Sequence, residues 1–151
     1  LRLILAGAGG DASADVAAAI AGLPNPIADR VDRLGPIDDA TKQSLLRQAS
    51  VLAYPSLDEG FGFPLLEAHA AGTPVVANDV GSIGEVAGGA ALLVKGRDPT
   101  AFATALERAI DDGALRLGLI EAGHRNVRRF DWNATARGLI ELYRRAIGEA
   151  P

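Results

Sequence analysis

The chain has 151 residues, of which 48% are hydrophobic and 23% charged, a composition that indicates one folded globular domain and excludes a disordered segment. The net charge of -4 gives no reason to expect nucleic acid as a partner. Because cysteine is absent and only two histidines are present, a disulfide framework, a thiolate nucleophile and a metal site are not expected. No run approaches the roughly 18 apolar residues of a membrane span, and we expect a cytoplasmic protein.

The first part of the chain alternates strand patterns with helical patterns. The expected elements are, in chain order, a strand at 2–6, a helix at 11–23, a strand at 30–34 and a helix at 40–49. Pro24-Asn-Pro26 is expected to end the first helix. Asp38 or Asp39 can cap the second helix, because a short acidic side chain accepts hydrogen bonds from the first free amides.

The same alternation continues to the end of the chain. The expected elements are a strand at 51–54, a helix at 64–71 ended by Gly72, a strand at 73–77, a short helix at 83–87, a strand at 91–94, and helices from Pro99 onward with breaks at Gly113 and near 130–132. Short strands that alternate with helices predict an α/β fold: a Rossmann-like parallel sheet with helices on both faces and a helical C-terminal tail. Trp132 is predicted to anchor the core between the last two helices.

The most informative stretch is Pro55-Ser-Leu-Asp-Glu-Gly-Phe-Gly-Phe-Pro-Leu-Leu-Glu67. It places Glu59 and Glu67 eight residues apart around a glycine-rich turn that joins an expected strand to an expected helix. Open α/β sheets bind phosphate groups at such a turn, whereas carboxylates suit the vicinal hydroxyls of a sugar. The motif therefore predicts a ligand with sugar at both ends and phosphate in the middle, which describes a nucleotide sugar.

Each residue type in this motif has an expected role. Gly60 and Gly62 permit close backbone approach, and amides at the helix start are expected to point towards an anion, Pro64 excepted. Glu67, one turn into the helix, can hold a diol such as ribose, although an acid there also stabilises the helix dipole for structural reasons. Glu59 is the candidate catalytic residue. The candidate donor-binding residues are Gly60, Phe61, Gly62, Phe63, Leu65, Leu66 and Glu67.

The pattern Pro55-Ser-x-x-Glu59-Gly-Phe-Gly-Phe-Pro-Leu-Leu-Glu67-Ala-x-Ala-x-Gly72-Thr-Pro-Val-Val closely resembles the signature of family-4 retaining glycosyltransferases. The resemblance is to their C-terminal, nucleotide-sugar-binding domain, and it continues through Gly81-Ser-x-x-Glu85-Val and Phe130-x-Trp132. It implies one half of a GT-B fold and transfer of a sugar from a nucleoside diphosphate to an acceptor with the anomeric configuration kept. It places Glu59 beside the donor sugar's hydroxyls, Glu67 on the ribose and the intervening amides on the diphosphate, with no metal or other cofactor.

By this resemblance, residues 1–151 form a single donor-binding domain that lacks its first strand, the basic pair near that strand and the N-terminal acceptor domain. Leu1 to Gly7 then corresponds to the second strand. The missing strand is central in a sheet of order 3-2-1-4-5-6, so we expect another segment or chain to supply it. The isolated chain is expected to be inactive. The expected partners are a nucleoside-diphosphate sugar and an unknown acceptor, which is a sugar, a lipid-linked molecule or a protein.

Two other functions stay open. Gly7-Ala-Gly-Gly-Asp-Ala12, followed about 20 residues later by Asp29 or Asp32, matches a loose dinucleotide fingerprint and favours an NAD-binding oxidoreductase domain. Asp11 argues against it, because a carboxylate beside a pyrophosphate is repelled. The other is a non-catalytic domain that binds a nucleotide sugar or merely keeps the fold, which nothing in the sequence rejects.

The remaining titratable residues have structural interpretations. His69 is expected to be packed or on the surface rather than catalytic, and His124 is expected to be solvated. The C-terminal helices carry a basic group of side chains: Arg125, Arg128, Arg129, Arg137, Arg144 and Arg145. A solvated face is the simpler interpretation of this group, and peripheral contact with an anionic membrane is the alternative.

Overall fold

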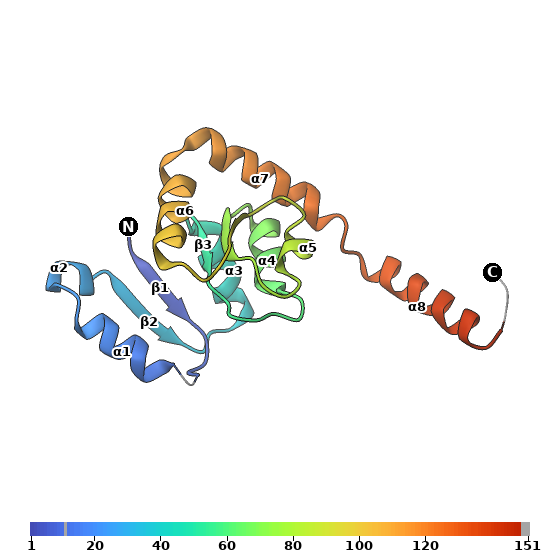
Figure 1. Ribbon diagram of the computed structural model, residues 1–151, viewed down its shortest axis with the longest axis horizontal. Coiled ribbons are helices and arrows are strands. Elements are labelled where there is room, and N and C mark those ends of the chain that lie inside the picture. The colour runs from blue at the N-terminus through green and yellow to red at the C-terminus, as the bar shows by residue number, and fades with distance from the viewer. Residues whose placement is uncertain (11, 149–151) are drawn as a thin grey trace. The chain divides into compact units, whose positions relative to one another are not determined.

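The computed structural model describes residues 1–10 and 12–148 (Figure 1). The elements are β1 (Leu3–Ala6), α1 (Ser13–Ala21), α2 (Asn25–Ala28), β2 (Val31–Gly35), α3 (Asp39–Gln48), β3 (Leu52–Tyr54), α4 (Phe63–Ala71), β4 (Val75–Asn78), α5 (Ile83–Ala87), β5 (Leu92–Val94), α6 (Pro99–Asp111), α7 (Gly113–Val127) and α8 (Trp132–Ala146). Every strand pair in the described part of the chain is parallel. The predicted α/β fold class is therefore confirmed.

Residues 1–44 form one compact unit. Its two strands pair in parallel, with Ile4 opposite Asp32, and the Arg2 guanidinium donates to the Asp32 carboxylate at 2.7 and 2.8 Å. These hydrogen bonds lower the pKa of Asp32 below its usual value. The short helix α2 was not expected, because Pro24-Asn-Pro26 was interpreted only as a break. Pro26 lies in the first turn of α2, where an N–H has no intrahelical partner and its loss is harmless.

Asp38 is the residue that caps α3. Its Oδ1 accepts a hydrogen bond of 2.7 Å from the Thr41 amide. The hydrogen bond from the Thr41 side chain, and then the one from its amide, lower the pKa of the Asp38 carboxyl. Of the two capping candidates, Asp39 already belongs to the helix. The helix runs across the division between the first compact unit and the second, which comprises residues 45–151.

The second unit is built on a three-stranded parallel sheet of order β3-β4-β5. Val76 in the middle strand lies opposite Ala53 on one side and Leu92 on the other, and all four residues of β4 are buried. Side chains alternate between the two faces of a strand, so β4 supplies two hydrophobic clusters. One contains Leu46, Leu65, Ala68, Val75, Ala77, Ile83, Val86 and Ala87, and the other contains Val76, Val94 and Ala109. The sheet is thus covered by α4 and α5 on one face and by α6 on the other.

β1 and β3 belong to different sheets, because β1 pairs with β2 and β3 pairs with β4. The prediction that a strand from another segment or chain completes the fold is compatible with this pairing and stays a prediction.

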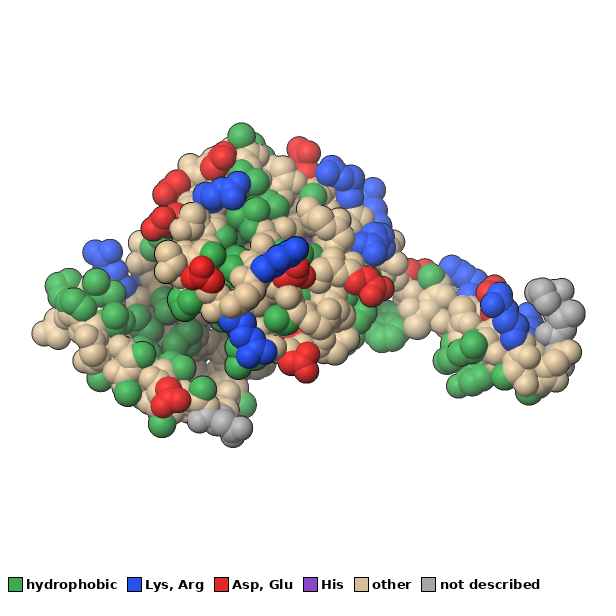
Figure 2. Space-filling model, viewed as in Figure 1, with side chains coloured by type: hydrophobic (Ala, Val, Ile, Leu, Met, Phe, Trp, Pro, Cys, Tyr) green, Lys and Arg blue, Asp and Glu red, His purple; other side chains and the backbone are tan. Residues whose placement is uncertain are grey.

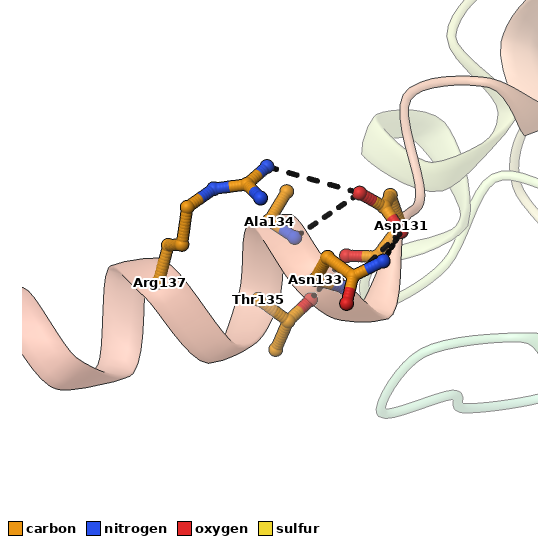
Figure 3. Close-up of polar contacts among 5 residues, drawn as sticks. All are labelled: Asp131, Asn133, Ala134, Thr135 and Arg137. Carbon is orange, nitrogen blue, oxygen red and sulfur yellow. Dashed lines mark hydrogen bonds and ion pairs between the residues drawn. The ribbon is translucent and has the colours of Figure 1, made fainter.

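The last helix begins at an aspartate cap (Figure 3). Asp131 Oδ1 accepts from the Asn133 amide at 3.1 Å, and its Oδ2 accepts from the Ala134 amide at 3.2 Å and lies 3.8 Å from an Arg137 nitrogen. Trp132, the first residue of the helix, is 78% exposed, so the prediction that it anchors the core is wrong. The reason is that every residue of α8 is exposed, which leaves the indole no neighbouring element to pack against.

Helix α8 is strongly amphipathic. Figure 2 shows hydrophobic side chains along one side of it and arginines on the other. Its large exposed apolar residues are Trp132, Leu139, Ile140, Leu142 and Tyr143. Over the described ranges, no helix combines the length and apolarity needed to cross a lipid bilayer.

Candidate functional site

The turn between β3 and α4 is held at the carboxyl edge of the three-stranded sheet. Asn78, the last residue of β4, donates from its side chain to the Ser56 carbonyl at 3.1 Å. Arg97, which follows β5, donates from its guanidinium to the Leu57 carbonyl at 2.9 Å. Polar side chains at the end of β4 and after β5 therefore hold the backbone of the loop that follows β3. This is the edge where open α/β sheets bind ligands.

The backbone of Glu59 is fastened to the start of α5. The Ser82 amide and the Ser82 hydroxyl both donate to the Glu59 carbonyl at 3.2 Å, and the same hydroxyl lies 3.1 Å from the Phe61 carbonyl. Gly81 has a φ of 51°, and a Cβ built there would lie 2.2 Å from the Glu59 carbonyl oxygen. Residue 81 must therefore be glycine for the two loops to approach this closely.

We expect Gly81→Ala to lower the free energy of unfolding by about 1–3 kcal/mol and to displace the Glu59 loop. The clash is with a backbone oxygen that Ser82 also holds, so neither partner can move alone. Urea denaturation measures the effect. Gly118→Ala is the control, because a Cβ at this helical position meets no atom within 4 Å and alanine favours a helix. Equal stability of the Gly81 and Gly118 variants would contradict the packing described.

The Glu59 side chain is half-buried and receives two hydroxyl donors. Tyr54 Oη donates to Oε1. Ser56 Oγ lies 3.0 Å from Oε1 and also 3.0 Å from the Asp58 carbonyl, so its single proton is shared between these two acceptors. Burial, and then the hydrogen bond to the Glu59 carboxylate, raise the pKa of Tyr54, so the phenol keeps its proton and remains a donor at neutral pH. Sequence reasoning placed Glu59 correctly in a loop but missed both hydroxyl partners. The available signal was that two hydroxyl side chains, Tyr54 and Ser56, flank Pro55 at the start of the motif.

Helix α4 begins without a side-chain cap. Gly62 precedes it with φ 96° and ψ 49°, and a Cβ there would lie 2.6 Å from Ile83 Cδ1, so this position also requires glycine. The Leu65 amide donates to the Gly62 carbonyl at 3.1 Å inside the first turn. It is therefore engaged by the helix itself. Pro64 is the second residue of the helix rather than the first.

The aromatic residues of the motif face different surroundings. The Phe61 ring packs 4.7 Å from the Phe63 ring and edge-on to Phe130 at 5.7 Å, measured between centroids. Phe63 is 56% exposed, whereas Leu65 is fully buried in the core. Glu67, like Glu59, is half-buried. Of the apolar members of the predicted site, Leu65 and Leu66 thus pack into the core, whereas Phe61 and Phe63 are exposed and both acids are half-buried.

His69 belongs to a buried structural network. Its Nε2 lies 3.0 Å from the Ala90 carbonyl, and its Nδ1 lies 3.3 Å from the Asn126 side-chain nitrogen. Asn126 also donates to the Val86 carbonyl at 2.7 Å. A neutral ring that donates from Nε2 and accepts at Nδ1 satisfies both contacts. Of the two structural positions expected for His69, packed or on the surface, the structure shows the packed one, and His124 is exposed as expected.

Protein stability should fall as the pH drops below about 6.5, the ordinary pKa of histidine. Burial lowers the pKa of His69, with the charge of His124 acting in the same direction and the Ala90 hydrogen bond opposing it. The unfolded chain therefore binds a proton at a pH where the folded chain does not, and protonation favours unfolding. Urea denaturation at pH 7.5 and pH 5 should show this loss. His69→Gln should reduce this loss. The exposed control His124→Gln should retain most of it, because burial is a larger cause of the shift than the charge of His124. An identical pH dependence in both variants would contradict the assignment.

Residues 1–112 match the model of the family described as glycosyl transferases group 1. The chain belongs to this family. A D-inositol 3-phosphate glycosyltransferase of Salinispora tropica is 40% identical over 128 residues, which cover 82% of this chain and 26% of that protein. The chain thus spans about a quarter of the length of the curated relatives it matches.

Solved structures of two other proteins share the fold. Sucrose-phosphate synthase from Thermosynechococcus elongatus superimposes with a TM-score of 0.83 at 30% identity, covering 99% of this chain and 39% of that one. Anabaena HepE in complex with UDP-glucose superimposes with a TM-score of 0.78 at 22% identity, covering 94% and 40%. The resemblance to GT-B glycosyltransferases is therefore confirmed at the level of family and fold, and it favours the glycosyltransferase interpretation over the NAD-binding one.

Proposed function

We propose that this chain is the donor-binding domain of a retaining glycosyltransferase, which transfers a sugar from a nucleoside diphosphate to an acceptor. The observation that carries the proposal is the placement of Glu59. Its carboxylate is held by Tyr54 and Ser56 at the carboxyl edge of a parallel sheet, just before the uncapped start of α4. An acceptor of hydrogen bonds beside a helix N-terminus suits a sugar hydroxyl beside a phosphate.

In this proposal the three parts of the donor occupy successive positions of the motif. Glu59 accepts hydrogen bonds from the donor sugar, and Glu67 accepts them from the ribose diol. Between them, the backbone at Gly60–Gly62 approaches the diphosphate, and the amides of Phe63 and Leu66 face it. The Leu65 amide contributes less than the sequence suggested, because it already donates to Gly62. No metal or other cofactor takes part in the proposal.

The chemistry proposed for the transfer is stabilisation of the leaving group by the helix terminus. As the bond between the anomeric carbon and the phosphate oxygen breaks, negative charge grows on the diphosphate, and the positive end of the α4 dipole stabilises it. The departing phosphate oxygen takes the proton of the acceptor hydroxyl as that hydroxyl attacks from the same face. The anomeric configuration is then kept, and no protein side chain has to act as the general base.

The relatives support this proposal through what they are named to act on or bind. The Salinispora relative is a glycosyltransferase of D-inositol 3-phosphate, and HepE has been crystallised with UDP-glucose. A nucleoside-diphosphate sugar is thus the proposed donor. The proposed acceptor is a sugar, a lipid-linked molecule or a protein, met in the cytoplasm, with the basic side of α8 available for peripheral contact with anionic lipid.

A thermal-shift panel of UDP, GDP and ADP sugars, with NAD as the comparison, tests the proposal in the full-length protein. A ligand present at 100 times its Kd stabilises a protein by about 2.7 kcal/mol, so the correct nucleotide sugar should raise the Tm by several degrees. Stabilisation by NAD alone would overturn the proposal.

NMR of the product anomer then tests retention of configuration. An inverted product would contradict the mechanism, and donor binding without transfer to any acceptor would favour the non-catalytic alternative.

A further inference from the structure

Two hydroxyl groups converge on one oxygen of the Glu59 carboxylate. Tyr54 Oη and Ser56 Oγ both donate to Oε1. A carboxylate oxygen has two lone pairs, so Oε1 can accept from both hydroxyls. The Tyr54 hydroxyl is the main donor, because the Ser56 hydroxyl lies equally close, at 3.0 Å, to the Asp58 carbonyl. In the described part of the chain, neither of them bonds to Oε2. The two carboxylate oxygens of Glu59 therefore have different hydrogen-bond surroundings before any ligand binds.

The two donors are held by the fold itself. Tyr54 is the last residue of β3, pairs in register with Ala77 of β4, and packs against the larger hydrophobic cluster. The Ser56 carbonyl accepts a hydrogen bond from the side chain of Asn78, a residue that is only 5% exposed. Neither contact depends on the glycine-rich turn that would meet the phosphates.

We propose that Tyr54 and Ser56 are positioning residues, which hold Oε1 of Glu59 so that Oε2 is presented to a hydroxyl of the donor sugar. This inference rests on the proposed function of Glu59. Its physical basis is preorganisation: a free glutamate loses rotamer entropy when it binds, whereas a carboxylate already fixed at one oxygen loses little. Preorganisation of Glu59 should therefore raise the affinity for the sugar part of the donor and leave the affinity for the nucleotide part unchanged.

The test compares Tyr54→Phe and Ser56→Ala with Glu59→Ala in the full-length protein. Each variant is titrated with the nucleoside diphosphate alone and with the intact nucleotide sugar, and its kcat and KM are measured. We expect Tyr54→Phe to reduce donor kcat/KM about tenfold and Ser56→Ala about threefold, with affinity for the free nucleoside diphosphate changed less than about twofold. Tyr143→Phe is the matched control, since Tyr143 is the other tyrosine of the chain and is 61% exposed on α8.

A double-mutant cycle separates positioning from a structural role. In the Glu59→Ala background, Tyr54→Phe should have no further effect on kcat/KM, because the group it positions is gone. A tenfold loss in that background, or an equal loss of affinity for free nucleotide and nucleotide sugar, would overturn the inference. Ser56→Ala provides the same cycle if Tyr54→Phe does not fold.

The cycle also distinguishes this inference from the function on which it rests. If Glu59→Ala leaves sugar-dependent binding and kcat unchanged, the proposed role of Glu59 is wrong. If Glu59→Ala lowers them while Tyr54→Phe and Ser56→Ala match the Tyr143→Phe control, only the positioning role is overturned.

Discussion

Glu59→Gln is expected to lower kcat by about ten- to a thousandfold, a loss of roughly 1.4–4 kcal/mol of transition-state stabilisation. Tyr54 and Ser56 offer two hydroxyl donors at the position of Oε1, so the amide oxygen of the glutamine should settle there. Its NH₂ group then replaces Oε2 and presents a donor where the sugar hydroxyl needs an acceptor. The substitution also removes the negative charge beside the sugar while keeping the size of the side chain.

Steady-state kinetics and calorimetry together check this result. The Kd of the free nucleoside diphosphate should stay within about twofold of the original value, because Glu59 is proposed to contact the sugar and not the nucleotide. Glu141→Gln is the matched control, since Glu141 lies exposed on α8 away from the motif. Full activity of Glu59→Gln would show that this carboxylate has no role in sugar placement.

Glu67→Ala is expected to weaken binding of the nucleoside diphosphate by about ten- to a hundredfold. Hydrogen bonds from two ribose hydroxyls to a charged carboxylate are together worth roughly 1.5–3 kcal/mol, which corresponds to that change in Kd. The side chain is half-buried on α4, about one turn after Gly62, between core residues that fix the helix. Its neighbours Leu65 and Ala68 are fully buried and hold this part of α4 against the core.

Comparison of ribose with deoxyribose nucleotides makes this prediction specific. The original protein should bind a ribonucleoside diphosphate more tightly than its 2′-deoxy analogue, and Glu67→Ala should bind the two nearly equally. Thermal denaturation of the variant establishes that it is folded. The ribose assignment fails if Glu67→Ala retains the original affinity and the original discrimination.

The sequence predicted the elements well because their signals are local. Short apolar runs located each strand that the structure describes, and Gly72 ended α4 with a left-handed φ of 76°, as glycine allows. The α2 helix was missed because two prolines look like a break even when one of them occupies a first turn. Trp132 was placed wrongly because an aromatic residue in an amphipathic pattern indicates a packed face without identifying the element that covers it.

The candidate site shows the same division between local and tertiary information. Glycine spacing predicted the tight turn and the start of α4. The side chains that hold the backbone of the Glu59 loop could not be predicted, because Ser82 reaches the Glu59 carbonyl from 23 positions further along the chain and Asn78 reaches the Ser56 carbonyl across 22. The engagement of the Leu65 amide was also outside local reasoning, since it depends on how tightly the first turn of α4 is wound.

The most direct test of donor binding is a crystal structure of the full-length protein with an intact nucleoside-diphosphate sugar. We expect the diphosphate at the N-terminus of α4, with the Glu67 carboxylate about 2.6–3.2 Å from both ribose hydroxyls and Oε2 of Glu59 at a similar distance from a hydroxyl of the sugar. A nucleotide sugar bound away from residues 59–67, or bound there with both carboxylates turned from its hydroxyls, would contradict the account.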